Sequence, residues 1–283
     1  MIIDFRVRPP FKSFLKMGNL FGPKGSVHSY PVNGPGTMPV PSADNESMDD
    51  FMKEMDEAGI NIGCLLGRRA ATSWTGVEMA DIHELCQKYP GRFIGFGAVD
   101  VSDDILLSLS LVEEGKKYGF KGMVCEPGNS TYPAYADDRR LYPFYARCVE
   151  LDMIVVISMS QFLGPDISYS EPHRVQRICR DFPKGKFVVA HAGYPHVTEA
   201  IGACMAENNL YLIPDLYWTV TQVPGRNLWT EGAAWLQGKK LLFGTAYPFR
   251  GLIQSVQDMK NVGLPEKYYN MVMYENAKEL LQI

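Results

Sequence analysis

The chain has 283 residues, a formal net charge of −4 and 46% hydrophobic residues, which is the balance of an ordinary globular protein. The slight acidic excess argues against nucleic acid as a partner, because phosphate binding needs a concentrated basic face. No apolar run reaches the roughly 18 residues of a membrane span, and the charged opening Met-Ile-Ile-Asp-Phe-Arg lacks the apolar core of a signal peptide. Six scattered cysteines with no C-x-x-C pair are read as reduced. We therefore expect a cytoplasmic protein.

Eight short apolar segments alternate with amphipathic helical stretches along the chain. Ile82, Leu85, Cys86 and Tyr89, for example, follow the i, i+3, i+4, i+7 spacing of one helical face. The predicted strands are Ile2–Val7, Ile60–Leu66, Arg92–Val99, Phe120–Cys125, Met153–Ser158, Lys186–Ala190, Leu210–Ile213 and Lys240–Gly244. This pattern predicts a (β/α)8 TIM barrel that forms one domain over residues 1–283. A doubly wound sheet is the alternative, but no glycine-rich phosphate loop follows the first strand.

Residues 9–47 interrupt this pattern directly after the first strand. They are rich in proline and glycine, so we expect neither a helix nor a central strand there. In a barrel, a loop in this position rises from the face where active sites form. Long irregular loops in compact domains are usually functional or disordered. We interpret residues 9–47 as a lid-like insertion, with an ordinary surface loop as the alternative.

Polar residues stand at the predicted carboxyl ends of the strands, where a barrel gathers them into one pocket. On the first strand, strict alternation predicts that Asp4, Arg6 and Arg8 face the barrel axis, whereas Phe5 and its alternate neighbours pack against helices. The later strand ends supply Arg68 or Arg69, Glu126, Ser158, Ser160, His191, Asp215 and Tyr247.

Four segments form an ordered set along the chain. They are Met1-Ile-Ile-Asp-Phe-Arg-Val-Arg8, Phe187-Val-Val-Ala-His-Ala-Gly193, Leu241-Leu-Phe-Gly-Thr-Ala-Tyr-Pro248 and Glu275-Asn-Ala-Lys-Glu-Leu-Leu281. In this order they resemble the I-D-x-H-x-H first strand, the strand-six histidine, the strand-eight G-[ST]-D-x-P and the closing helix of the amidohydrolase-related (amidohydrolase 2) family. The resemblance implies a (β/α)8 barrel of the hydrolase and decarboxylase type that acts on small acids.

The resemblance also implies one divalent metal, such as zinc, held by two strand-one histidines, a strand-five histidine and a strand-eight aspartate. In this chain those positions fall on Arg6, Arg8, Ser158 and Ala246, and only the strand-six His191 is kept. Arginine is always protonated and has no lone pair to donate, and two guanidinium groups repel a cation. We therefore expect no metal cofactor. The alternative is a conventional zinc-dependent amidohydrolase with ligands elsewhere in the chain.

A cationic pocket is predicted in place of the metal. Arg6 and Arg8 are expected to hold a carboxylate or a phosphate bidentately, with a structural ion pair between Arg6 and Asp4 as the alternative. His191 is predicted to act as a general acid or base, because its reference pKa lies near neutrality. The alternative for His191 is a buried histidine bonded to the backbone.

Further residues at the strand ends complete the predicted site. Glu126 is the best carboxylate base, and its alternative is an ion pair with a pocket arginine. Asp215 is a third catalytic candidate, with loop capping as its alternative. The other predicted substrate contacts are Ser158, Tyr194, Tyr247 and Arg250.

Three functions remain open from the sequence. The first is a metal-independent enzyme for a small carboxylate- or phosphate-bearing substrate, with hydrolysis placed ahead of lyase or isomerase chemistry. The second is the zinc-dependent hydrolase, and the third is a non-catalytic barrel that binds an anionic metabolite. In each case the expected partner is a small anion, with no nucleic acid and no membrane, and a homodimer is left open.

Overall fold

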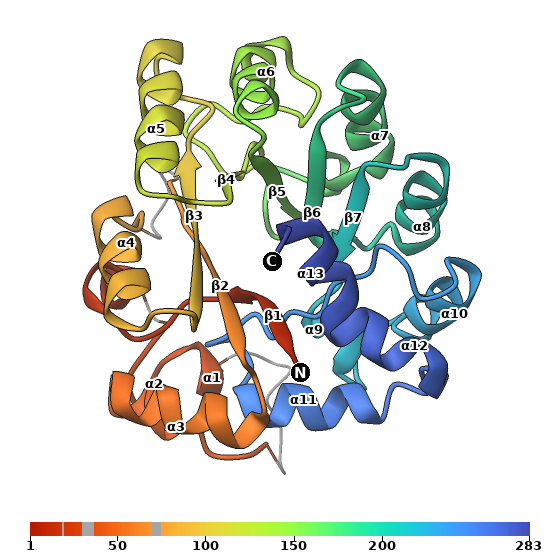
Figure 1. The fold of residues 1–283 in the computed structure, drawn as a ribbon. Helices are drawn as coiled ribbons and strands as arrows, with labels where there is room; N and C mark the ends of the chain where they lie inside the picture. The colour runs from red at the N-terminus through yellow and green to blue at the C-terminus, as the bar shows by residue number, and fades with distance from the viewer. Residues whose placement is uncertain (19, 30–36, 70–74) are drawn as a thin grey trace.

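Seven parallel strands follow one another around a nearly closed barrel (Figure 1). The structure is a computed structural model that describes residues 1–18, 20–29, 37–69 and 75–283. The strands are β1 (Ile3–Val7), β2 (Ile62–Leu66), β3 (Phe93–Val99), β4 (Gly122–Cys125), β5 (Ile154–Ser160), β6 (Lys186–Tyr194) and β7 (Leu210–Ile213). Each predicted strand from the first to the seventh is therefore present, with its ends shifted by a few residues at most.

Helices connect the strands and surround the barrel (Figure 1). The longer helices are α3 (Met48–Ala58), α4 (Met79–Lys88), α5 (Ile105–Lys117), α6 (Tyr142–Glu150), α7 (Pro172–Asp181), α8 (Val197–Ala206), α10 (Asn227–Trp235) and α11 (Leu252–Lys260). Shorter turns are α9 (Leu216–Thr219), η2 (Arg139–Leu141) and η3 (Ile167–Ser170). The chain ends with α12 (Glu266–Asn270), a π-helical turn η4 (Met271–Glu275) and α13 (Asn276–Leu281).

The eighth predicted strand, Lys240–Gly244, is not a regular strand, but its backbone closes the barrel. On one side Leu242 N donates to Leu212 O at 2.9 Å, and on the other Phe5 N donates to Phe243 O at 2.9 Å. The segment therefore lies between β7 and β1, where the eighth strand of a TIM barrel belongs. The predicted fold class is confirmed.

β1 departs from the predicted alternation. Asp4 pairs with Gly63 and Val7 pairs with Leu65, so β1 holds one more residue than β2 between these pairs. The prediction that Ile3 and Phe5 pack against the helices is wrong, because both side chains lie in the barrel interior. A β-bulge re-aims the side chains that follow it, and Val7 packs toward the helices as predicted.

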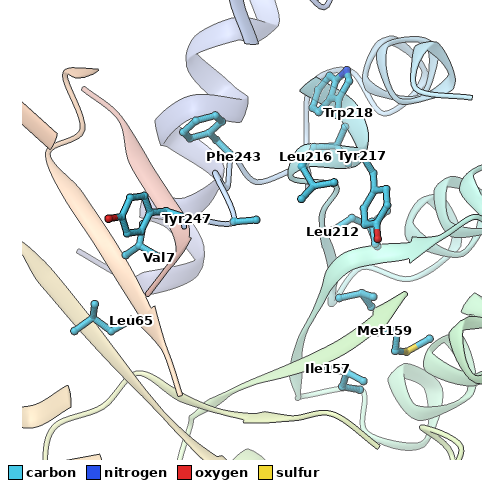
Figure 2. Close-up of a cluster of buried hydrophobic side chains, with 14 of the residues drawn as sticks. Val7, Leu65, Ile157, Met159, Leu212, Leu216, Tyr217, Trp218, Phe243 and Tyr247 are labelled. Carbon is cyan, nitrogen blue, oxygen red and sulfur yellow. The ribbon is translucent and has the colours of Figure 1, made fainter. Parts of the chain in front are cut away.

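Two apolar cores hold the barrel together. The inner core fills the barrel, and α13 closes one end of it with Leu280 and Leu281. Figure 1 shows α13 lying across the centre of the ring of strands. The outer core lies between strands and helices, and Figure 2 shows Val7, Leu65 and Tyr247 in it. The two cores therefore fix the strands whose ends form the polar cavity described below.

Residues 9–47 contain short helical turns, which corrects the prediction that no helix forms there. These turns are η1 (Lys12–Lys16), α1 (Ser26–Ser29) and α2 (Pro41–Asp44). Proline is tolerated at the start of a helix, where its missing N–H costs no hydrogen bond, and α2 begins at Pro41. Residues 19 and 30–36 of the predicted lid lie outside the described residues, so the lid remains a prediction.

The state of the cysteines and the character of the helices agree with what the sequence composition predicts. All six cysteines are free, and burial raises the pKa of Cys125 to about 12, as expected of an unreactive thiol. In the parts of the chain that the structure describes, no helix is both long enough and apolar enough to cross a bilayer.

The packing of α13 against one end of the inner core leads to a prediction about stability. Leu280 is 4% exposed in the inner core, whereas Leu106 on α5 is 73% exposed. Leu280→Ala is expected to lower the free energy of unfolding by about 2–5 kcal/mol, because it leaves a cavity. Leu106→Ala is the matched control and should change it by less than about 0.5 kcal/mol. Urea unfolding of both variants gives the comparison, and equal effects would contradict the role of α13.

Candidate active site

A cavity of about 260 Å³ opens at the carboxyl ends of the strands. It lies just below the range of roughly 300–1,000 Å³ common for drug-sized ligands, so it suits a small molecule. It is lined by Arg6, Arg8, Arg68, Glu126, Ser160, Phe162, Leu163, His191, Leu216, Tyr217 and Phe249. The structure thus brings together five of the predicted site residues: Arg6, Arg8, Glu126 and His191 line the cavity, and Asp215 contacts two of them.

Aromatic and aliphatic side chains form the rest of the cavity wall. The ring of Tyr194 stacks on the ring of Tyr217, and their centroids lie 4.3 Å apart. The Tyr194 hydroxyl donates to Pro224 O at 3.1 Å. Tyr194 was a predicted substrate contact, but it is not among the residues that line the cavity. It packs instead against Tyr217, which does line it. Apolar walls around a charged floor favour an organic acid over an inorganic anion.

Arg6, Asp215 and His191 form one group of interacting side chains, which we call the histidine group. Asp215 Oδ2 lies 2.9 Å from His191 Nδ1 and 3.7 Å from an Arg6 terminal nitrogen. Among the described residues, neither Asp215 oxygen has an aligned hydrogen bond, and His191 Nδ1 has none. Catalytic hydrogen bonds often align only when substrate is bound. Because Nδ1 faces the carboxylate, Nε2 is the nitrogen left to face the cavity.

Arg8, Glu126 and Arg68 form a second group, which we call the paired-arginine group. Arg68 Nε donates to Glu126 Oε2 at 3.0 Å, and a terminal nitrogen of Arg8 lies 3.5 Å from Oε1. Asn129 also donates to Glu126 Oε2 at 3.1 Å. The alternative interpretation of Glu126, an ion pair with pocket arginines, is therefore what the structure contains.

Burial and charge set the protonation of these groups. Burial lowers the pKa of His191 below its usual value, Arg6 lowers it further, and Asp215 opposes both. Burial raises the pKa of Glu126, but the charges of Arg68 and Arg8 outweigh this and bring it to about 2. At neutral pH the site therefore holds a neutral imidazole and an ionised Glu126.

Asp4 does not pair with the Arg6 side chain as the alternative interpretation proposed. Its carboxylate accepts from Arg6 N at 3.0 Å, from Thr245 N at 3.0 Å and from Thr245 Oγ1 at 2.6 Å. Burial raises the pKa of Asp4 to about 7 in spite of these hydrogen bonds. Asp4 thus joins β1 to the eighth segment directly below the cavity.

The backbone is strained at several strand ends around the cavity. His191 and Ala192 have φ angles of 63° and 50°, Asp215 has 44° and Ala246 has 59°. Residues other than glycine rarely adopt such φ angles. These angles persist where the surrounding structure enforces them, often at functional sites. Gly193 follows at 70°, and a Cβ there would lie 2.9 Å from Ser170 O. His191 and Asp215 are therefore aimed by the fold.

Three other predicted substrate contacts are not among the cavity-lining residues. Ser158 is buried in β5 with no hydrogen-bond partner for its hydroxyl among the described residues, and Ser160 lines the cavity in its place. The Tyr247 hydroxyl lies 2.8 Å from Ser42 Oγ, on the helix side of the barrel. Arg250 Nε donates to Asp258 at 2.9 Å. Their roles in substrate contact remain predictions.

Sequence reasoning did not choose between Arg68 and Arg69, and it did not find the apolar wall. Arg68 is 1% exposed and lines the cavity, whereas Arg69 pairs with Asp103 at 2.5 Å on the surface. Phe162 and Leu163 lie in the loop after β5. A loop carries no periodicity, so no signal in the sequence assigned them to the site.

A family model described as amidohydrolase matches residues 40–283, well over half of the chain. The chain belongs to the amidohydrolase family. Comparison with curated proteins gives no match. Among solved structures, an uncharacterised TIM-barrel protein of Bordetella bronchiseptica is 31% identical, with a TM-score of 0.91 over 99% of this chain and 98% of its own.

More distant structures share the fold. A probable 2-pyrone-4,6-dicarboxylic acid hydrolase of Acinetobacter baumannii with bound citric acid is 14% identical, with a TM-score of 0.68 over 100% of this chain and 99% of its own. A dihydroxybenzoic acid decarboxylase of Polaromonas with bound manganese and an inhibitor is 18% identical, with a TM-score of 0.61 over 83% of this chain and 86% of its own.

The cavity of this amidohydrolase does not fit a divalent metal of that kind. Three guanidinium groups line it, and each would repel a divalent cation. The strand-eight position is Ala246, whose side chain offers no ligand. Within residues 1–18, 20–29, 37–69 and 75–283, no group of three His, Cys, Asp or Glu side chains is placed to hold a metal.

This disagreement gives a prediction about metal content. Protein purified without chelators is expected to carry well under one tightly bound divalent ion per chain by elemental analysis. Dialysis against a chelator should leave ligand binding unchanged, because arginines supply the positive charge. Near-stoichiometric zinc or manganese, removed together with binding, would contradict the prediction and support the zinc-dependent alternative.

Proposed function

We propose that this amidohydrolase cleaves an ester or lactone bond in a small carboxylic acid without a metal. The observation that carries the proposal is the 2.9 Å contact between His191 and Asp215 in a cavity lined by three buried arginines. A base, a group that orients it and cations for a developing oxyanion are the parts that acyl hydrolysis needs. The two distant structures described above, a probable dicarboxylic acid hydrolase and a dihydroxybenzoic acid decarboxylase, support a carboxylic acid as the substrate class.

The proposed reaction uses His191 twice. Nε2 takes a proton from a water molecule, whose oxygen adds to the acyl carbon and forms a tetrahedral oxyanion. Arg6 stabilises this oxyanion. The imidazolium then donates the proton to the leaving alkoxide as the acyl–oxygen bond breaks, which gives a carboxylic acid and an alcohol. Asp215 stabilises the imidazolium between the two steps.

Glu126 is the weaker candidate for the base. A carboxylate with a pKa of about 2 between two arginines binds protons poorly at neutral pH. His191 is neutral there and has a free nitrogen. We therefore assign the base to His191, and we assign to Glu126 the positioning of Arg8 and Arg68.

The first test uses a coloured product. The 4-nitrophenyl monoester of glutaric acid carries one carboxylate, and its hydrolysis releases 4-nitrophenolate. We expect turnover by the wild type and a loss of about 10²–10⁴-fold in kcat for His191→Asn, because asparagine cannot transfer the proton. His173→Asn, on the exposed start of α7, is the matched control and should keep full turnover. Full turnover by His191→Asn would remove this residue from the mechanism.

The second test is the pH dependence. His191 acts as a base only when neutral, and its pKa lies below the usual 6.5. The kcat/KM should therefore fall on acidification as the imidazole gains a proton, with a midpoint below the usual 6.5. In Asp215→Asn the supporting charge is lost, so the fall should move to still lower pH while kcat drops. A fall that begins above pH 7 would contradict this assignment.

A further inference from the structure

The ion pairs of the cavity form two groups that share only β1, although Arg8 also interacts electrostatically with Arg6 and Asp215 of the other group. Arg6 belongs to the histidine group and Arg8 to the paired-arginine group. The paired-arginine group draws on β1, β2 and β4, whereas the histidine group draws on β1, β6 and β7. A bound molecule that fills the cavity therefore meets two different electrostatic environments.

The two groups differ in net charge. Two guanidinium groups surround one carboxylate in the paired-arginine group, which leaves an excess of one positive charge. In the histidine group one guanidinium faces one carboxylate beside a neutral imidazole, which leaves no excess. Burial lowers the pKa of Arg8 to about 9, so Arg8 still carries its charge at neutral pH. Each charged side chain in both groups is less than 9% exposed, so solvent screens these charges weakly.

The guanidinium group of Arg8 is only loosely held. One of its terminal nitrogens lies 3.5 Å from Glu126 Oε1, and its Nε is buried without a hydrogen-bond partner among the described residues. Buried charged donors are normally paired, and an unpaired one costs free energy. Arg6 is in a similar state, at 3.7 Å from Asp215. Both cations are therefore arranged for acceptors that a ligand brings.

We propose that the paired-arginine group is the subsite for the substrate's carboxylate, and that the histidine group is the subsite for its uncharged acyl bond. This assignment rests on the proposed function. The carboxylate lies against Arg8 and Arg68, and the acyl oxygen lies against Arg6 beside His191. Glu126 is a positioning residue for the two arginines.

The assignment predicts a preference for monoacids. One carboxylate neutralises the excess charge of the paired-arginine group. A second carboxylate would lie in the neutral histidine group, next to the buried Asp215, and like charges at short range in a buried site repel strongly. A neutral acyl bond meets no such penalty. The cavity thus selects a molecule with one charged end and one uncharged reactive end.

The binding experiment does not depend on turnover. Calorimetry with benzoate as a monoacid and isophthalate as a diacid should show tighter binding of benzoate. Arg68→Met should weaken benzoate binding by about tenfold or more, because a charge-assisted hydrogen bond is lost. Arg6→Met, the matched control, should weaken it by less than about threefold. Equal losses in the two variants would overturn the assignment.

A second variant guards against misfolding of Arg68→Met. Glu126→Gln keeps the size of the side chain and removes its negative charge, so the net charge of the subsite rises by one. It should tighten isophthalate binding more than benzoate binding, and so narrow the preference for monoacids. An unchanged preference would overturn the charge argument.

Kinetics with the glutarate monoester separate this proposal from the proposed function. Arg68→Met should mainly raise KM, and Arg6→Met should mainly lower kcat. 4-Nitrophenyl pentanoate, which has a methyl group in place of the carboxylate, should lose far less kcat/KM in Arg68→Met than the glutarate monoester does. If neither ester reacts but the calorimetric pattern holds, the carboxylate subsite stands and the hydrolase proposal fails. If both esters react and Arg68→Met changes neither KM, the hydrolase proposal stands and the subsite fails.

Discussion

Three buried positive charges at one end of the barrel are the constraint on which the rest of the site depends. Removing an ion from water is costly, and a buried charge persists only where other groups compensate it. Glu126 compensates Arg8 and Arg68, and Asp215 compensates Arg6. With two carboxylates against three guanidinium groups, the compensation is incomplete by one charge. An anionic ligand completes it, so electrostatics that weaken the empty fold favour the bound state.

The rigid barrel makes this incomplete compensation tolerable. The bulge in β1 lets Phe5 fill the inner core while Arg6 and Arg8 both reach the cavity. Asp4 joins β1 to Thr245 below them, and positive φ angles aim His191 at the end of β6 and Asp215 after β7. Such strain is sustained by the two apolar cores, which fix the strands independently of the site.

The fold was predictable from the sequence because its signal is repeated: apolar segments alternate with amphipathic helices, and ordered motifs run along the whole chain. Arg6, Arg8, Glu126 and His191 were predictable because a barrel gathers its strand ends into one place. The bulge in β1 was not predictable from the sequence, since one extra residue leaves the apolar pattern unchanged. Nor was the helix-side location of Tyr247, because the irregular eighth segment does not follow strand alternation. Loop residues such as Phe162 lie outside any period.

In the function proposed above, arginines take the place of a metal, and this limits the chemistry in a specific way. A catalytic metal ion both polarises the acyl oxygen and lowers the pKa of its bound water to about 7. Under the proposed mechanism, guanidinium groups stabilise the oxyanion but bind no hydroxide, so the activation of water falls to His191 alone. Its lowered pKa keeps it neutral at physiological pH and, by the same cause, makes it a weaker base. A weak base suffices where the acyl carbon is electrophilic and the leaving oxygen departs readily. Under the proposed mechanism, esters and lactones of that kind are therefore better substrates than amides, whose leaving nitrogen demands more proton transfer than this site supplies.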